Sequence, residues 1–499
     1  MQHFKITFQP DSKWISIHEG ATLLEAAHQA AIILNTVCGG KGSCRKCALR
    51  LEPSGEEVLA CQYKIDSDLT VTVPQSSRFF EQKILEHGIE TKSEFQPDVY
   101  KNYQAVAGQN KILGLAVDIG TTTIVAKLID LTTGKCLDTQ TDYNPQMRYG
   151  DDVISRIDYA QTQTKLAELQ LVLIDCLNSL IEELCDDPNQ IYELAAVGNT
   201  TMSHIFFGFP ITQLGQAPYK AHTLDAHQIT AKELGIAINP DAKVRIVENI
   251  AGFVGSDSVA AALAAGMDLV EQLTLLVDIG TNGELVLGTK QKLYAASCAA
   301  GPALEGAKID QGSRAVDGAI EAVVINEGDV DVDVIGDSPA SSICGSGLID
   351  AVAVMLELGV LDHTGRFVEP ARLKDKLPPA VLRRLVQKDN QPAFVLAYTD
   401  DSDKPSVTLT QKDIRELQLA KAAIRTGISL LLEKVRLNDS DIEQVLLSGA
   451  FGNYIKKTSA LRIGLLPDVA TDKIHFVGNA ASSGAQTILI NTAARDLAG

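Results

Sequence analysis

An internal repeat constrains the fold of this chain more than any other feature of its sequence. The segments ILGLAVDIGTTTIVAKLID and LTLLVDIGTNGELVLGTK each carry an apolar run that ends in Asp, Gly and Thr and then continues into a second apolar run. The aspartates of the two copies, Asp118 and Asp278, are 160 residues apart. This pattern predicts strand, tight turn and strand in both copies, and therefore two related halves, roughly residues 111–272 and 273–499.

The two turns have the composition of phosphate-binding loops. Gly120 and Gly280 let the backbone approach a ligand closely, and successive N–H groups of a turn can cradle an anion. Additional hydroxyl donors come from Thr121, Thr122, Thr123 and Thr281. Asp118 and Asp278 would repel a bare phosphate, so they favour a hydrated Mg²⁺ that bridges the phosphate oxygens. A single Asp-Gly turn could be an ordinary hairpin connection, but two copies with matching flanks favour the phosphate site.

Other phosphate-binding motifs do not fit these turns. A Rossmann unit and a P-loop both need a helix after the glycine turn, and the P-loop also needs a Gly-Lys-Thr/Ser ending. A third segment, VLLSGAFGNYI at residues 445–455, reads instead as a buried strand that runs into a glycine-rich turn. The small residues of this turn would let adenine or ribose lie against the backbone, and they are Ser448, Gly449, Ala450 and Gly452. After it, HFVGNAASSGAQTILI predicts a strand followed by a small-residue helix that permits close helix packing.

In this order, the two Asp-Ile-Gly-Thr turns, the Ser-Gly-Ala-Phe-Gly turn and the closing Gly-Asn-Ala-Ala helix resemble the actin and sugar-kinase ATPase superfamily. The resemblance covers about four-fifths of the chain and implies two ribonuclease-H-like lobes that clamp ATP. It implies that the phosphate loops run from Asp118 to Thr123 and from Asp278 through Asn282 to Gly283. Ser448 to Gly452 would be the adenosine loop.

The amino-terminal residues 1–75 form a separate module in this prediction. HFKITF and KWISIH alternate like a hairpin with its turn at QPDS, and ATLLEAAHQAAII predicts a helix with a capping box of Thr22 and Glu25. CALRLE and LTVTVP predict further strands. Residues 76–110 are polar, without a clear core pattern, and are expected to be a linker.

Four cysteines of this module have the spacing of a metal or cluster site. Cys38, Cys44, Cys47 and Cys61 come close to the plant-type 2Fe-2S pattern, with one extra residue in the first gap and a short last gap. Tetrahedral zinc is the alternative, but zinc motifs usually pair two C-x2-C knuckles and only one is present, so the spacing favours the cluster. The remaining cysteines have no ligand spacing, and we expect them to be small core residues: Cys136, Cys176, Cys185, Cys298 and Cys344. Cys298 and Cys344 lie in glycine-bearing segments, which weakens that expectation for them.

Composition excludes several classes of partner. The net charge of -19 and the pI near 4.9 argue against nucleic acid and against an anionic membrane surface. The chain starts without the basic and apolar regions of a signal peptide, and no apolar run approaches a bilayer span. An odd number of cysteines, nine, favours a reducing compartment, so we expect a cytoplasmic protein.

A ferredoxin-like module followed by an ATPase is similar to one family over the whole chain, the ATP-dependent reductive activators of corrinoid proteins. The stretches AAVGNTTMSHIFFG, ENIAGFVGSDSVAAAL, SCAAGPALEGAKIDQGSRAVDGAI and SICGSGLIDAVA also resemble family signatures. The resemblance implies an α/β protein: a small α+β (β-grasp) ferredoxin domain followed by the two-lobed ATPase. It implies reduction of an inactive Co(II) corrinoid to Co(I), with 2Fe-2S, ATP and Mg²⁺ as cofactors. The partners implied are a corrinoid protein of a methyltransferase system, a low-potential electron donor and a second copy in a homodimer.

Other residues have two open interpretations each. Asp118 and Asp278 are expected to hold Mg²⁺ or water, and Glu284 either orients the attacking water or is a solvated strand residue. Gly345 and Gly347 either present N–H groups to a nucleotide at a helix start or simply begin that helix. Residues 297–314 either face the corrinoid partner or form an inserted loop.

Three other functions compete with this one. A small-molecule kinase with a redox-sensing domain would need a substrate pocket with a base, and no such constellation is apparent. An activator of radical dehydratases would hold a 4Fe-4S cluster between two subunits, without an amino-terminal ferredoxin domain. An electron-transfer or scaffold protein without catalysis would not need intact phosphate loops.

Overall fold

The computed structural model forms two compact units, Met1–Gln82 with Gln146–Tyr159, and Lys83–Pro145 with Ala160–Gly499. The residues that the structure describes are 3–10, 12–30, 32, 34, 42, 45, 47–74, 77, 95–98, 112–336, 338–399, 402–449 and 455–499.

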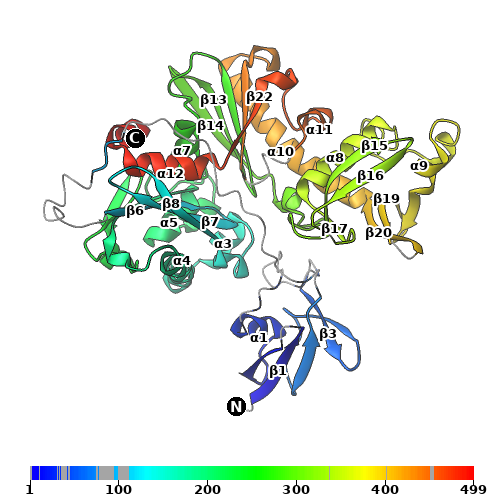
Figure 1. The fold of residues 1–499 in the computed structure, drawn as a ribbon, viewed down its shortest axis with the longest axis horizontal. Coiled ribbons are helices and arrows are strands. Elements are labelled where there is room, and N and C mark those ends of the chain that lie inside the picture. The colour runs from blue at the N-terminus through cyan, green and yellow to red at the C-terminus, as the bar shows by residue number, and fades with distance from the viewer. Residues whose placement is uncertain are drawn as a thin grey trace. The chain divides into compact units, whose positions relative to one another are not determined.

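The first unit contains a five-stranded mixed sheet with one helix of the amino-terminal module (Figure 1). In sheet order its strands are β2 (Lys13–His18), β1 (His3–Gln9), β5 (Leu69–Thr72), β3 (Ala48–Glu52) and β4 (Glu57–Leu59). β1 is antiparallel to β2 and parallel to β5. The helix α1 (Leu23–Gln29) starts at the predicted capping box, where the Glu25 amide donates to Thr22 Oγ1 at 3.1 Å and Glu25 Oε2 accepts from the Thr22 amide at 2.6 Å. This arrangement confirms the β-grasp prediction. The unit also includes α3 (Val153–Tyr159).

The first sheet of the second unit carries the first copy of the sequence repeat. In sheet order its strands are β10 (His227–Thr230), β11 (Lys243–Ile246), β9 (Ile191–Gly198), β6 (Leu113–Ile119), β7 (Thr123–Asp130) and β8 (Cys136–Tyr143). The three strands β6, β7 and β8 are consecutive and antiparallel, whereas β9 is parallel to β6 and β11 is parallel to β9. Nearly every residue of β6 and β7 is buried, as their apolar runs predict.

The second sheet repeats this topology around the second copy. In sheet order its strands are β14 (Lys292–Cys298), β13 (Gly283–Thr289), β12 (Thr274–Ile279), β21 (Gln444–Ser448) and β22 (Ile474–Gly478). Again three consecutive antiparallel strands are followed by two parallel ones. The repeat in sequence is therefore a repeat in structure, and each copy is strand, tight turn and strand as predicted.

Two further small sheets lie between β14 and the long helix α10 in sequence. One has the order β16 (Asp329–Val334), β15 (Ala319–Asn326), β17 (Ser342–Ile343), and the other the order β18 (Leu385–Lys388), β19 (Gln391–Thr399), β20 (Ser402–Thr410). Neither sheet was predicted from the sequence. Their inward side chains share one core with the second lobe, including Val323, Phe394 and Leu409.

The helices of the second unit cover its sheets. They are α4 (Gln163–Leu184), α5 (Thr200–Phe207), α6 (Ala231–Leu234), α7 (Ser256–Ala264), α8 (Gly345–Glu357), α9 (Pro379–Arg383), α10 (Gln411–Val435), α11 (Lys457–Arg462), α12 (Ala480–Ile490) and α13 (Thr492–Ala498). Within the described part of the chain, none of the helices has the length and apolar character needed to cross a membrane.

The helix α12 comes from the end of the chain but packs against the first sheet and α7 (Figure 1). A Cβ atom at Gly484 would lie 2.0 Å from the carbonyl oxygen of Ala260 in α7, so only glycine fits this crossing. The prediction of a closely packed small-residue helix is confirmed.

Residues 95–98, which fall in the predicted linker, are part of the second unit. Gln96 forms a parallel bridge with Asn491, and its amide donates to the Ile490 carbonyl at 2.9 Å. Asp98 accepts from both terminal nitrogens of Arg245 at 3.3 and 3.4 Å. Residues 95–98 are therefore anchored beside the first sheet and α13.

Candidate functional site

The two predicted phosphate loops face each other in the second unit. Thr122 follows β6 and Thr281 follows β12, and their hydroxyl oxygens are 2.8 Å apart. In each loop the glycine amide donates to a carbonyl further along the loop: Gly120 to Thr123, three residues on, at 2.9 Å, and Gly280 to Asn282, two residues on, at 3.1 Å. A Cβ atom at Gly120 would lie 2.6 Å from the Thr123 oxygen, which explains the glycine there.

The two repeat aspartates are held by residues that come late in the chain. Asn479, the N-cap of α12, donates to Asp118 Oδ2 at 3.1 Å. Ser448, the last residue of β21, donates to Asp278 Oδ2 at 2.7 Å. In both lobes the aspartate at the strand end therefore accepts a hydrogen bond from a neutral donor, which brings no positive charge to the carboxyl group.

Burial raises the pKa of Asp118 to about 7, the nearby Asp278 adds to the increase, and the Asn479 hydrogen bond opposes it. Burial also raises the pKa of Asp278 against the hydrogen bond from Ser448. Glu284 lies opposite Asp278 in the β12–β13 register. Burial, followed by the charges of Asp257 and Asp278, raises the pKa of Glu284 well above its usual value. These buried carboxyl groups favour a bound cation, because a nearby positive charge stabilises their ionised form.

Asp257 is a site residue that the sequence analysis missed. It lies in the first turn of α7, whose start is fixed by Gly255, where a Cβ atom would lie 2.2 Å from the Gly198 carbonyl oxygen. Burial, then the charges of Asp118 and Asp278, raise the pKa of Asp257 to about 7. The only signal was an aspartate two residues after a glycine in the family-like stretch ENIAGFVGSDSVAAAL.

Glu305 was also missed as a site residue. It ends a short 3-10 helix, Pro302–Glu305, and accepts hydrogen bonds from the hydroxyls of Thr122 and Thr281. Arg314 lies 3.8 Å from Glu305 Oε2. Both residues fall in residues 297–314, which were expected either to face the partner or to form an inserted loop. The side chains of Ala303, Leu304 and Glu305 are buried.

The predicted adenosine loop is described only at its start. Ser448 is buried, and Gly449 has a φ of +95° with a Cβ position 2.5 Å from the Ile279 carbonyl oxygen. This glycine permits close approach of the loop to β12. Ala450 and Gly452 lie outside the described residues.

Gly345 and Gly347 begin α8, as predicted. A Cβ atom at Gly345 would lie 1.9 Å from the Leu304 carbonyl oxygen, and one at Gly347 would lie 2.2 Å from the Ile320 carbonyl oxygen. Close helix packing therefore gives both glycines a structural reason, and a contact with a nucleotide stays a prediction.

The cysteine module is described in part. Cys47 and Cys61 are buried in the core of the first unit, and the Ala60 amide donates to the Cys47 carbonyl at 3.0 Å, which brings their segments together. Gly42 has a φ of +76°, which favours glycine in this loop. Cys38 and Cys44 lie outside the described residues, and within the described ones no group of three or more His, Cys, Asp or Glu could hold a metal ion. Two buried thiols on adjoining segments fit the soft donor set of an iron–sulfur cluster.

Two other cysteines lie in the second lobe: Cys298 lies beside the second predicted phosphate loop, and Cys344 stands at the start of α8. Cys298 donates to the Gly283 carbonyl at 3.1 Å, and burial raises its pKa to about 12. Burial also raises the pKa of Cys344 at the start of α8. Thiols with raised pKa values are poor nucleophiles and ligands at neutral pH, which supports packing roles for both.

Two lobes of one topology, with facing Asp-Ile-Gly-Thr turns and a shared set of carboxylates, define a two-lobed ATPase of the actin and sugar-kinase type. Comparisons with known proteins specify the class further. Residues 272–498 match the family model described as the C-terminal domain of RACo, the ASKHA domain, and residues 113–270 match the RACo middle region.

The chain is 32% identical to the corrinoid activation enzyme RamQ of Eubacterium limosum, over 96% of this chain and 91% of that protein. It is 25% identical to the [Co(II) methylated amine-specific corrinoid protein] reductase of Methanosarcina barkeri, over 77% of this chain and 71% of that protein. A solved structure of a reductive activator for a corrinoid, iron-sulfur protein has 31% identity and a TM-score of 0.70, with 99% of this chain and 94% of that chain covered. The chain belongs to the RACo family of reductive activators of corrinoid proteins, which confirms the resemblance found in the sequence.

Proposed function

We propose that this protein uses ATP to reduce the corrinoid of a partner protein from inactive Co(II) to Co(I). One observation carries the proposal: the hydroxyls of Thr122 and Thr281 meet at 2.8 Å between two carboxylate-bearing loops, on a chain that also carries a four-cysteine module. The similarity to corrinoid activators along nearly the whole chain supports the same function.

The nucleotide half of the reaction is assigned to the two loops. Their glycines and threonines bind the phosphates of ATP, and Ser448 to Gly452 bind the adenosine. The remaining backbone donors are those of Thr121, Thr123, Asn282, Gly283, Gly345 and Gly347. Asp118 and Asp278 would hold a hydrated Mg²⁺, which supplies the positive charge that phosphate needs in an acidic site.

Glu284 is assigned to orient the water that attacks the terminal phosphate. Its pKa is raised by burial and by neighbouring carboxylates. A carboxyl group with a raised pKa can hold the proton that the water loses as the bond to phosphorus forms. Its cross-strand position next to Asp278 places it in the same carboxylate set.

The redox half is assigned to the cysteine module. Cys38, Cys44, Cys47 and Cys61 would hold a 2Fe-2S cluster, which carries single electrons at low potential when bound. The balance of the reaction is one electron lost by an external low-potential donor and one gained by cobalt. The chain's own contribution is to bury two of these thiols and to present the module to the partner.

ATP assists this reduction only if its bound states have different affinities for the Co(II) and Co(I) forms of the partner. We assign the exposed part of residues 297–314, which includes Lys308 and Asp310, to partner contact. A cytoplasmic location and a homodimer complete the proposal.

An anaerobic assay tests the function. Protein loaded with iron and sulfide is mixed with a Co(II) corrinoid protein and a reductant, and the cobalt spectrum is followed with and without MgATP. Co(I) should form only with ATP, and both Cys44→Ser and Asp278→Ala should abolish it, while Cys136→Ser at an exposed cysteine should not. ATP turnover that ignores several corrinoid proteins and yields no Co(I) would refute the proposal.

A further inference from the structure

A carboxylate already occupies the position where the two phosphate loops meet. Glu305 is only 9% exposed. It accepts a short hydrogen bond from Thr281 Oγ1 on Oε1 and one of 3.3 Å from Thr122 Oγ1 on Oε2. The three side chains come from three separate parts of the chain, so this contact is built by the fold and not by local sequence.

The contact with Glu305 uses the hydroxyl protons that a bound phosphate would need. Each threonine hydroxyl has one proton to donate. The Thr281 proton goes to Glu305, and the Thr122 proton is shared between Thr281 Oγ1 at 2.8 Å and Glu305 Oε2 at 3.3 Å. A phosphate between the loops needs these same protons, and it is repelled by the same carboxylate.

The backbone around Glu305 is fixed by close contacts. The Leu304 carbonyl oxygen lies against Gly345, where any Cβ atom would come within 1.9 Å. Gly306 has a φ of +76°, and its Cβ position would lie 2.1 Å from the Ser313 carbonyl oxygen. The segment that carries Glu305 therefore closes on itself and packs against the start of α8.

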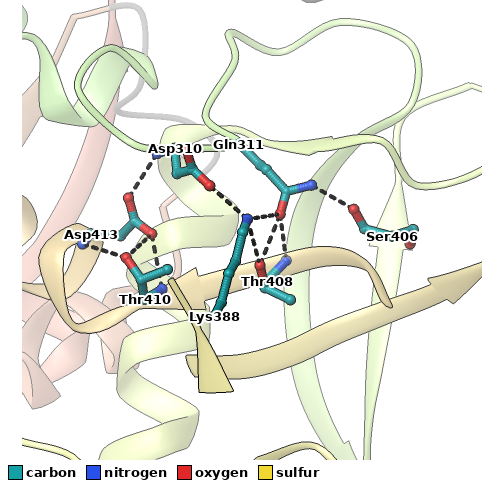
Figure 2. A network of polar contacts seen from close by, with 7 residues as sticks. All are labelled: Asp310, Gln311, Lys388, Ser406, Thr408, Thr410 and Asp413. Atoms are coloured by element: carbon teal, nitrogen blue, oxygen red, sulfur yellow. Dashed lines mark hydrogen bonds and ion pairs between the residues drawn. The ribbon is translucent and has the colours of Figure 1, made fainter. Parts of the chain in front are cut away.

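The far end of the same segment is tied to the β18–β20 sheet and to α10 (Figure 2). Lys388 donates to Asp310 Oδ2 at 2.6 Å and to Thr408 Oγ1 at 3.1 Å. The Asp310 amide donates to Asp413 Oδ1, in the capping box of α10, at 2.7 Å. Gln311 Oε1 accepts from the Thr408 amide at 3.0 Å. With both ends held, the Glu305 backbone cannot move away without breaking these contacts, so release of the threonines must come from rotation of its side chain.

We propose that Glu305 is a positioning residue of the ATP site, and that it competes with phosphate for the hydroxyl protons of Thr122 and Thr281. A nucleotide then binds only by displacing this carboxylate from the threonines. Arg314, 3.8 Å from Glu305 Oε2 and stacked 4.6 Å from the Tyr143 ring centre, partly neutralises the carboxylate in the nucleotide-free protein. The inference rests on the proposed function, because it takes the loops to be the phosphate site.

Calorimetric titration of the full-length protein with ATP, in EDTA and again with Mg²⁺, tests the competition. Glu305→Gln keeps the shape and removes the charge, so it should bind ATP about tenfold more tightly under both conditions. Glu305→Asp keeps the charge and should stay within about threefold of the wild-type affinity. Glu327→Gln removes an exposed glutamate elsewhere in the same lobe and should leave the affinity unchanged.

Other outcomes overturn the proposal. If Glu305→Gln binds ATP with the wild-type affinity, the proposal is wrong. If Glu305→Gln binds ATP more weakly, and only when Mg²⁺ is present, the carboxylate instead orients the hydroxyls toward the metal. If the wild-type protein binds no ATP at all, the proposed function itself fails.

A second variant keeps the test decisive if Glu305→Gln does not fold. Arg314→Gln leaves the carboxylate without its cation and should by itself weaken ATP binding about tenfold. Where Glu305→Gln does fold, the double variant should recover the affinity of Glu305→Gln. An Arg314→Gln affinity equal to or tighter than wild type would overturn the proposal, as would a double variant that stays weak.

Discussion

Replacing Asp257 by asparagine should stabilise the metal-free protein, although it removes a residue of the candidate site. Asp257 accepts from the Ser258 amide at 2.7 Å through Oδ1, a contact that the asparagine carbonyl oxygen can keep. The substitution therefore changes the charge of the site with little change in its local hydrogen bonding. The change in the free energy of unfolding therefore measures how strongly the carboxylates between the lobes repel one another.

The size of the effect follows from the pKa of Asp257, which burial and the charges of Asp118 and Asp278 raise from 3.8 to about 7. The folded protein holds this proton more tightly than the unfolded chain, so the stability of the wild-type protein falls as the pH rises from about 4 through 7. About three pKa units correspond to at most about 4 kcal/mol at pH 8. Part of this energy is shared with neighbouring carboxylates, so we expect a gain of about 1–4 kcal/mol for the variant.

Urea unfolding in EDTA at several pH values measures the gain. The difference between Asp257→Asn and wild type should be small near pH 4, increase up to pH 7 and then level off. Asp186→Asn, at an exposed aspartate of the same lobe, serves as the control and should show no such trend. If Asp257→Asn has the same or a lower stability than wild type at pH 8, the carboxylates do not repel one another as the structure indicates.

Three further changes probe the frame of the site. Gly484→Ala would place a Cβ atom 2.0 Å from the Ala260 carbonyl oxygen, so it should lower the free energy of unfolding by about 3 kcal/mol in urea titrations; an unaffected midpoint would contradict the close helix crossing. Burial raises the pKa of Glu193 to about 7, so the folded protein binds this proton more tightly than the unfolded chain does. As the pH rises from about 4.5 through 7, the free energy of unfolding of the wild type should therefore fall by up to about 3 kcal/mol relative to that of Glu193→Gln. Parallel plots of stability against pH would contradict this. Asp98→Asn weakens the pairing with Arg245, so it should lower the free energy of unfolding by about 2 kcal/mol and speed protease cleavage near residues 95–98. A cleavage rate equal to that of the wild type would argue against the anchor.

The strands and turns around the site could be predicted because local patterns determine them. β6 and β12 are buried apolar runs that end in the same three residue types, and this similarity predicted the matching topology of the two lobes. Small residues likewise predicted that α12 packs closely. Its partner α7 could not be predicted, because more than 200 residues separate the two helices and sequence spacing carries no information about such a contact.

The same reasoning explains which site residues were missed. Asp118 and Asp278 could be named because each carries its own motif. Asp257 and Glu305 have no motif of their own, and they reach the site through glycine contacts that depend on the folded packing of α7 and α8. Burial also changed how the segment around Glu305 is understood, since small and polar residues suggested a loop whereas the structure places Ala303 and Leu304 in the core.

The charge of the site gives a reason for the metal that the proposed function includes. Asp118, Asp257, Asp278 and Glu284 all have pKa values raised by burial, and three of them also by one another, so each added negative charge meets increasing resistance. A bare triphosphate would have to enter this field and also displace Glu305 from two threonines. A divalent cation reverses the electrostatic balance, because it pairs with the carboxylates and offsets the phosphate charge at the same time. On the proposed function, the acidic site therefore selects the metal complex of ATP over free ATP, and it does so through the same carboxylates that make the metal-free protein less stable above pH 7.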